Sequence, residues 1–152
     1  MRSGTGTNQT SIFLNGVRIQ NGTVSNAFVA STTSYIGSAA SNYYFNGYIS
    51  NLRLVGGTAL YDPTLTTLTV PSAPLTNVSG TMVLGCQSNH LVDNATASAI
   101  TVTSAGAPTV KTFNAFDFPS HFSYYFGGLN NYLSVPYTSN FRIAVTLQLR
   151  HS

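Results

Sequence analysis

The 152-residue sequence predicts an all-β protein, a sandwich of antiparallel sheets. Short runs of β-branched and aromatic residues recur along the chain, and turn signals rich in asparagine and glycine separate them. No segment of helical length repeats its apolar residues with a period of 3.6. Hydrophobic residues make up 43% of the chain and charged residues 6%, a balance that favours an ordered core over disorder.

The first expected element is a β-hairpin. Its strands are Ile12–Leu14 and Val17–Ile19, and the Asn15-Gly16 pair between them supplies the two positive-φ positions of a type I′ turn. The second such pair, Asn21-Gly22, predicts another turn or a bulge.

The next expected strands are Ser34–Ile36, which Gly37 ends, and Tyr48–Val55, which Gly56 and Gly57 end. In Tyr48–Val55 the apolar residues alternate imperfectly with polar ones. We therefore expect a strand with one buried face.

The following segments carry weaker signals. Thr58–Pro63 predicts a turn or a single helical turn, and Thr64–Pro74 an extended surface segment. Thr81–Cys86 predicts a buried strand because it is nearly continuously apolar, and Ala99–Thr103 predicts another strand by its alternation.

Acidic residues are too few for most hydrolytic and metal-dependent chemistry. Asp62, Asp93 and Asp117 are the only carboxylates, and there is no glutamate. Glycoside hydrolysis generally needs two carboxylates beside one bond, and calcium cages need several charged oxygen ligands. Because the spacing of the three aspartates does not bring them together, we expect no enzyme activity, no metal and no cofactor.

The net charge of +3 comes from six scattered arginine and lysine residues, which form no basic patch for nucleic acid. No apolar stretch is long enough to cross a membrane, so we expect no membrane insertion. Cys86 ends an apolar run and is expected to be buried and inert. Its spacing to His90 resembles that of metal ligands, but no further ligand is near, so His90, His121 and His151 are interpreted as incidental.

Several motifs, taken in order, resemble one known family. Phe13–Val17 is similar to its strand–Asn-Gly–strand hairpin, Tyr35–Gly37 to the short strand that follows, and Phe45–Leu54 to its most characteristic strand. Thr58–Tyr61 and Leu84–Ser88 resemble later segments. The family is that of laminin-G-like jelly rolls of the concanavalin superfamily, especially those in marine phage structural proteins such as tail fibres.

The resemblance implies a two-sheet antiparallel jelly-roll sandwich that is incomplete or permuted. Residues 1–118 resemble the C-terminal part of the domain, whereas Tyr124–Pro136 resembles its opening strands. Residues 119–152 would therefore be the N-terminal strands of a following, or completing, jelly roll with an atypical tail. Relatives bind glycans or proteins, often through Ca²⁺, but their aspartate-rich calcium ligands have no match in this chain.

The tail itself predicts a change of reading frame. Codons that can encode Val145–Ser152 can also spell, in a shifted frame, the strand Asp-Phe-Thr-Ile-Glu-Ala-Phe with which the family continues. We therefore hypothesise a frameshift between Asn140 and Ala144, and the DNA sequence decides it.

The leading functional hypothesis is a non-catalytic adhesion or recognition module on a virion or extracellular surface, with a glycan or surface protein as partner. Tyr43, Tyr44 and Asn46 are the expected contact residues, because aromatic faces stack on sugars and amides bind hydroxyls. The alternative is a purely structural building block that self-associates through open sheet edges, its C-terminal strands completing a neighbouring copy. Other tyrosines that either stack on a ligand or pack the core are Tyr48, Tyr124, Tyr125 and Tyr132.

Overall fold

The computed structural model describes residues 7–23, 33–39, 43–57, 59–96, 101–112, 122–136 and the backbone of 144–150. Every regular element in this part of the chain is a β-strand, which confirms the all-β prediction. All the strand pairs are antiparallel. The strands are β1 (Thr10–Leu14), β2 (Val17–Gly22), β3 (Thr33–Ile36), β4 (Ser38–Ala39), β5 (Tyr43–Tyr44), β6 (Asn46–Val55), β7 (Thr81–Gly85), β8 (Thr103–Ala105), β9 (Thr109–Lys111), β10 (Ser123–Gly127), β11 (Tyr132–Pro136) and β12 (Ala144–Arg150).

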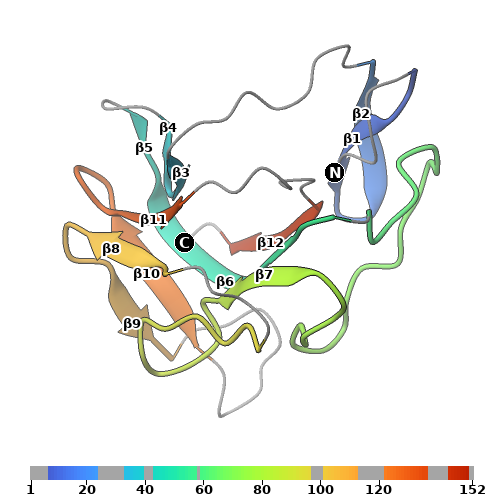
Figure 1. Cartoon of the computed structure of the whole chain (residues 1–152). Coiled ribbons are helices and arrows are strands. Elements are labelled where there is room, and N and C mark those ends of the chain that lie inside the picture. Colours follow the sequence, from blue (N-terminus) through green and yellow to red (C-terminus); the bar gives the residue numbers. More distant parts are fainter. Residues whose placement is uncertain are drawn as a thin grey trace.

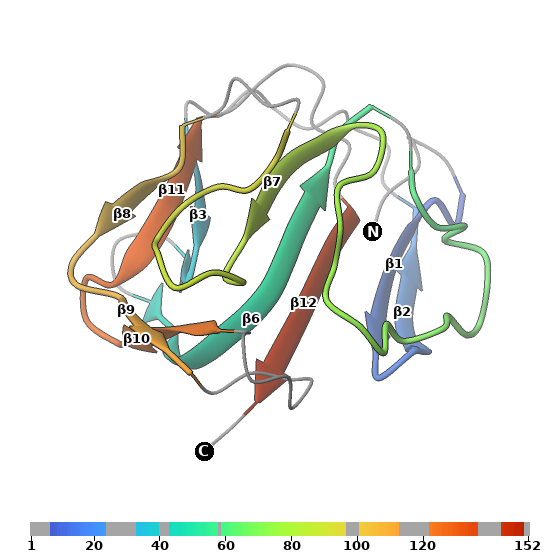
Figure 2. The same ribbon diagram turned by 90° about the horizontal axis from the view of Figure 1, so that it is seen from below.

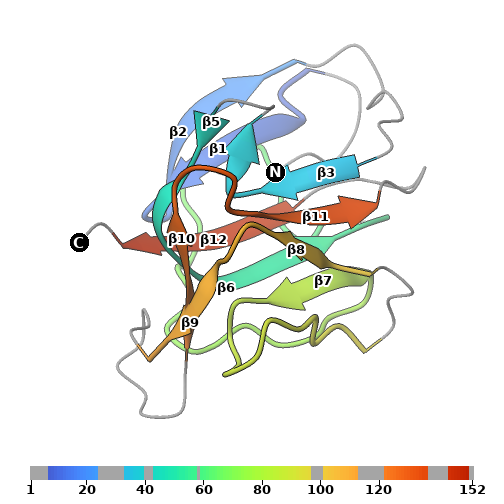
Figure 3. The ribbon, with the colours of Figure 1, turned by 90° about the vertical axis from the view of Figure 1, so that its left-hand side faces the viewer.

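Two of the sheets enclose the core as a β-sandwich (Figure 1). The larger has the order β12-β6-β10-β9, with β7 also paired to β6, and the smaller has the order β3-β11-β8. In Figure 3 the strands β8 and β11 of the smaller sheet lie toward the viewer. Leu52 and Phe126 of the larger sheet belong to one buried cluster with Leu133 and Val135 of the smaller.

The central strand of the larger sheet is β6. One of its edges pairs with β12, and the other pairs first with β10 and then with β7 (Figure 2). All residues from Ile49 to Val55 are buried, so the expectation of one buried face is wrong. The second face is covered because the chain between β6 and β7 crosses it, where Arg53 donates hydrogen bonds to the carbonyl of Thr76 and the hydroxyl of Tyr61.

A β-bulge explains the imperfect alternation in β6. Asn51 has a φ of 56°, and the register of β12 shifts so that two residues of β6 oppose one of β12. The extra residue reverses the alternation of the strand. Ile49 and Leu52 therefore face the same core although three positions separate them.

The hairpin of β1 and β2 is confirmed at its turn. Asn15 and Gly16 have φ values of 51° and 79°, as a type I′ turn requires. The second Asn-Gly pair makes no turn, because Asn21 and Gly22 continue β2 opposite β1. The irregularity lies earlier in β2, where Ile19 is an extra residue between Arg18 and Gln20, the partners of Phe13 and Ile12.

The remaining expectations are met in part. Strands are present at Thr33–Ile36 and Thr81–Gly85, and residues 64–74 run without a long strand, mostly exposed. No helical turn is present in residues 59–63, where a turn follows Asp62 instead; Thr58 lies outside the described residues. The strand expected at Ala99–Thr103 begins only at Thr103, and Ala99 and Ile100 lie outside the described residues.

The strands of the 119–152 segment pair with strands of the 1–118 segment of the same chain. β10 lies between β6 and β9, and β11 lies between β3 and β8. The last strand, β12, pairs with β6. The proposed frameshift window, Asn140 to Ala144, lies outside the described residues except for the backbone of Ala144.

Candidate functional site

The three expected contact residues lie at one end of the sandwich, where β5 and β6 begin. The side chain of Tyr43 is 73% exposed. The hydroxyl of Tyr44 donates a 2.8 Å hydrogen bond to Oδ1 of Asn130, a residue 86 positions away in the turn between β10 and β11. Neighbouring residues of a strand point to opposite faces, so Tyr44 anchors this end of the molecule while Tyr43 presents its ring to solvent.

Asn46, at the start of β6, is fixed by contacts with β10. Its Oδ1 accepts a hydrogen bond of 3.4 Å from the hydroxyl of Tyr125, and its backbone lies opposite Gly127 in the pairing of β10 with β6. The ring of Tyr125 packs on that of Tyr48 with 5.1 Å between their centroids. We call Tyr43, Tyr44, Asn46, Tyr125 and Asn130 the tyrosine cluster.

The sequence did not single out Asn130 or separate the roles of the tyrosines. Tyr124 is 1% exposed and belongs to the core, whereas its neighbour Tyr125 is in the tyrosine cluster. Tyr132 packs edge-on against Tyr35 at 5.2 Å. The alternation along β10 accounts for the difference between Tyr124 and Tyr125, because only one of the two can face the core.

Both described aspartates bind nearby backbone amides. Oδ1 of Asp62 accepts from the backbone N–H and the hydroxyl of Thr64, at 2.8 and 2.7 Å, and these bonds lower the pKa of its carboxyl. Oδ1 of Asp93 accepts from the N–H of Leu84 and of Ala95, at 2.8 and 2.9 Å. Each carboxylate thus holds a turn or loop in place. Asp117 lies outside the described residues.

Cys86 is fully buried, and burial raises the pKa of its thiol well above the usual range. His90 is exposed, with its Nδ1 2.6 Å from Oδ1 of Asn89, and its carbonyl accepts a hydrogen bond from the hydroxyl of Tyr124. The described residues contain no cluster of three or more metal-ligating side chains. His121 and His151 lie outside the described residues.

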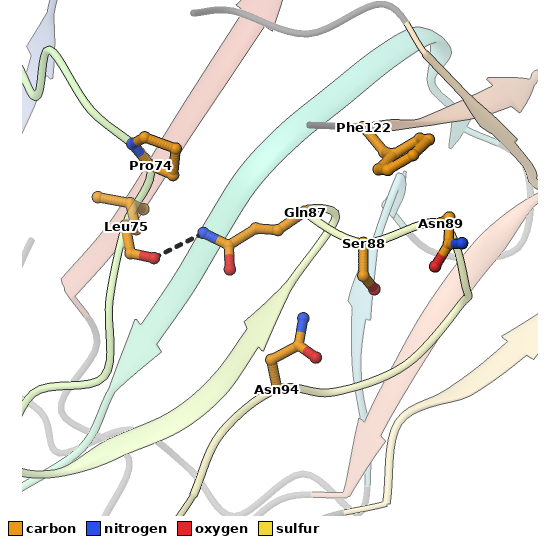
Figure 4. Close-up of a pocket in the computed structure, with 7 residues that line it drawn as sticks. All are labelled: Pro74, Leu75, Gln87, Ser88, Asn89, Asn94 and Phe122. Atoms are coloured by element: carbon orange, nitrogen blue, oxygen red, sulfur yellow. Dashed lines mark hydrogen bonds between the residues drawn. The ribbon is translucent and has the colours of Figure 1, made fainter. Parts of the chain in front are cut away.

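A second candidate site, which the sequence did not indicate, is a hollow beside the end of β7. We call it the amide pocket; its volume is about 420 Å³. Figure 4 shows its polar side chains gathered around an open space. The signal was hidden because amides and hydroxyls are common throughout this sequence. The lining residues are Pro74, Leu75, Gln87, Ser88, Asn89, Asn94 and Phe122.

Comparison of this chain with protein-family models, with curated proteins and with solved structures finds no match. Within the described ranges there is no helix whose length and apolar character would let it cross a membrane. A functional assignment therefore depends on the tyrosine cluster and the amide pocket.

Proposed function

We propose that this chain is a non-catalytic recognition module that binds a glycan on a surface through its tyrosine cluster. The observation that carries the proposal is the exposed ring of Tyr43, next to a residue anchored to Asn130. A tyrosine offers a large, rigid contact face at low conformational cost, and its hydroxyl adds a polar contact. The amide of Asn46, whose Oδ1 accepts the hydroxyl of Tyr125, supplies a further hydrogen-bonding group at the start of β6.

The resemblance to laminin-G-like jelly rolls supports the same class of function. Members of that family bind glycans or proteins, and those it resembles most occur in phage structural proteins. We propose a jelly-roll topology and a place on a virion or extracellular surface on this ground. The scarcity of carboxylates, two of which bind backbone amides, supports a module without catalysis.

The test is a glycan array probed with the wild-type protein and two variants. Tyr43→Ser removes the exposed ring, and we expect binding to fall about tenfold, as for a lost stacking contact. Ile19→Ser is the control, because Ile19 is 58% exposed and lies on β2, which pairs with β1 and not with the strands of the cluster. An array on which the wild-type protein binds no glycan would contradict the proposal.

A second candidate function is a structural building block that assembles through open sheet edges. The observation that favours it is β12, which ends the path of the larger sheet and pairs with β6 alone among the described strands. An edge strand presents unpaired backbone groups to which another chain can add. Light scattering at micromolar concentration tests this function: association supports it, and a clean monomer contradicts it.

A further inference from the structure

The amide pocket is built by three segments that are distant in the sequence. Leu75 comes from the chain before β7, Gln87 and Asn94 come from the loop after it, and Phe122 precedes β10. A volume of about 420 Å³ lies within the range of small-molecule sites, roughly 300–1,000 Å³. None of the residues that line it carries a formal charge.

The orientation of the Gln87 amide is fixed by a buried network. The backbone N–H of Leu75 donates to Oδ1 of Asn51 at 3.1 Å, so this oxygen is an acceptor. Nε2 of Gln87 must therefore face it, at 2.8 Å, and it also donates to the carbonyl of Leu75 at 2.8 Å. Both amide hydrogens are used, which turns Oε1 of Gln87 toward the pocket as an acceptor (Figure 4).

Asn94 faces Gln87 across the pocket (Figure 4). Two hydrogen bonds fix its backbone. Its N–H donates to the carbonyl of Leu84 at 2.7 Å, and its carbonyl accepts from Nδ2 of Asn77 at 2.9 Å. Its side-chain amide makes no hydrogen bond to a described residue. The pocket thus combines a fixed acceptor on Gln87 with a donor and an acceptor on Asn94.

The apolar residues of the lining are Phe122, Pro74 and Leu75, and two of them contribute rings. The position of Phe122 is set by its backbone, whose carbonyl accepts a 3.2 Å hydrogen bond from the hydroxyl of Ser50 on the central strand. An aromatic face beside neutral amides matches a ligand with both hydroxyl groups and an apolar C–H face.

We propose that the amide pocket binds one neutral sugar residue of a glycan. A sugar hydroxyl both donates and accepts, so it can satisfy Gln87 Oε1 and the Asn94 amide together. A carboxylate or phosphate would lose hydration without gaining a cationic partner from the lining residues, so the pocket favours uncharged sugars over acidic ones.

The pocket is separate from the tyrosine cluster. Phe122 precedes β10, and Gly127 at the other end of β10 pairs with Asn46 of the cluster. Five strand residues place the two sites about 17 Å apart at 3.4 Å per residue. The inference rests on the proposed function for the class of ligand, a glycan, but it places that ligand at a different site. A longer glycan that reached both the pocket and the tyrosine cluster would bind more tightly because of the second contact.

The test is a titration followed by NMR, with backbone and side-chain amide signals of the ¹⁵N-labelled protein assigned. The probes are glucose, galactose, mannose and N-acetylglucosamine, each added to about 50 mM, which covers millimolar dissociation constants. Glucuronate is the charged comparison. We expect saturable shifts of the Gln87 and Asn94 side-chain amides with at least one neutral sugar, and weaker shifts with glucuronate.

Two variants sharpen the result. Asn94→Ala should weaken binding at the pocket about tenfold, because it removes both hydrogen-bonding groups that have no described partner. Gln20→Ala, on β2 and outside the lining of the pocket, should leave binding unchanged. The inference is overturned if no neutral sugar shifts the pocket amides, or if glucuronate binds them more tightly. Shifts confined to Tyr43, Tyr44 and Asn46 would overturn the sugar site in the pocket while supporting the proposed function. Shifts at the pocket without any at the tyrosine cluster would support the sugar site and count against the cluster as the binding surface.

Discussion

The side-chain amide of Gln87 donates a 2.8 Å hydrogen bond to the side-chain oxygen of Asn51, which sits at the bulge of the central strand. Asn51 is fully buried, and the same oxygen accepts the backbone N–H of Leu75. The bulge thereby links the packing of the larger sheet to the geometry of the amide pocket. Bulges commonly redirect side chains near functional sites, and this one positions Gln87.

Replacing Asn51 should therefore destabilise the protein. Asn51→Ala leaves the N–H of Leu75 and the Nε2 of Gln87 without their shared acceptor, at a cost of about 2–4 kcal/mol. Urea unfolding of both proteins measures the change. Asn94→Ala is the matched control, since its side-chain amide has no described partner, and it should shift stability by less than about 0.5 kcal/mol. Equal unfolding free energies for the wild-type protein and Asn51→Ala would contradict the network.

Gly37 lies where only glycine fits, after β3. Its φ is 84°, and a Cβ added there would lie 2.8 Å from Cδ1 of Phe126 in the core. Gly37→Ala should cost about 2–5 kcal/mol, from backbone strain together with overpacking. Gly57 has a similar φ of 86° with nothing within 4 Å of the added Cβ, so Gly57→Ala should cost only about 1–2 kcal/mol. Thermal unfolding compares them, and equal losses would mean that Phe126 moves aside freely.

The hydroxyl of Tyr124 ties the loop after β7 to β10. It donates to the carbonyl of His90 and accepts the N–H of Val92 at 3.0 Å. Tyr124→Phe should cost about 1–2 kcal/mol, because two hydrogen bonds of the hydroxyl are lost while the N–H of Val92 and the carbonyl of His90 remain bonded to each other at 2.9 Å. Tyr125→Phe removes only an exposed bond of 3.4 Å to Asn46 and should cost less than about 0.5 kcal/mol. Chemical denaturation distinguishes the two, and a larger loss for Tyr125→Phe would be inconsistent with the structure.

Stability should fall at alkaline pH because of Cys86. Burial raises the pKa of its thiol in the folded state, so the folded protein keeps the proton after the unfolded chain has lost it. The free energy of unfolding is unaffected by this group at pH values below the pKa of the thiol in the unfolded chain, about 8.5. It decreases as the pH rises from there toward the pKa of the thiol in the folded protein. Between pH 7 and pH 10 this loss amounts to about 2 kcal/mol.

Cys86→Ala isolates the thiol from the other groups that titrate at high pH, such as Tyr124, whose pKa burial also raises. Unfolding free energies measured at pH 7 and pH 10 should fall less for the variant than for the wild-type protein. The native thiol should also resist alkylation until the protein is denatured. Identical pH dependence of the two proteins would show that Cys86 does not contribute.

Local signals were enough to predict the strands that depend on local geometry. The turn at Asn15 and Gly16 is recognisable because its φ values favour these two residue types. The burial of both faces of β6 was not predictable, because the second face is covered by residues such as Tyr61 and Thr76 from beyond the strand. β9 was missed because three residues are too few to show a period.

The candidate sites were predictable to different degrees. Tyr43, Tyr44 and Asn46 stand out as an aromatic run beside an Asn-Gly pair, but Asn130 joins them only through pairing across 86 positions. The amide pocket gave no signal, because Gln87, Asn94 and Phe122 are separated in the chain and have ordinary residue types for this composition. Tertiary pairing alone brings them together.

The pairing of β6 has a consequence for how the protein folds during its synthesis. β6 emerges from the ribosome early, and β7 follows soon after it, but the other two partners of β6, β10 and β12, are translated much later. At 5–20 residues per second, the ribosome needs roughly 5–20 s to pass from Val55 to Ala144. During that interval β6, which has more buried residues than any other strand with described side chains, can pair only with β7 and keeps the edge that β12 will cover open, so we expect chains halted before β12 to depend on chaperones or to aggregate.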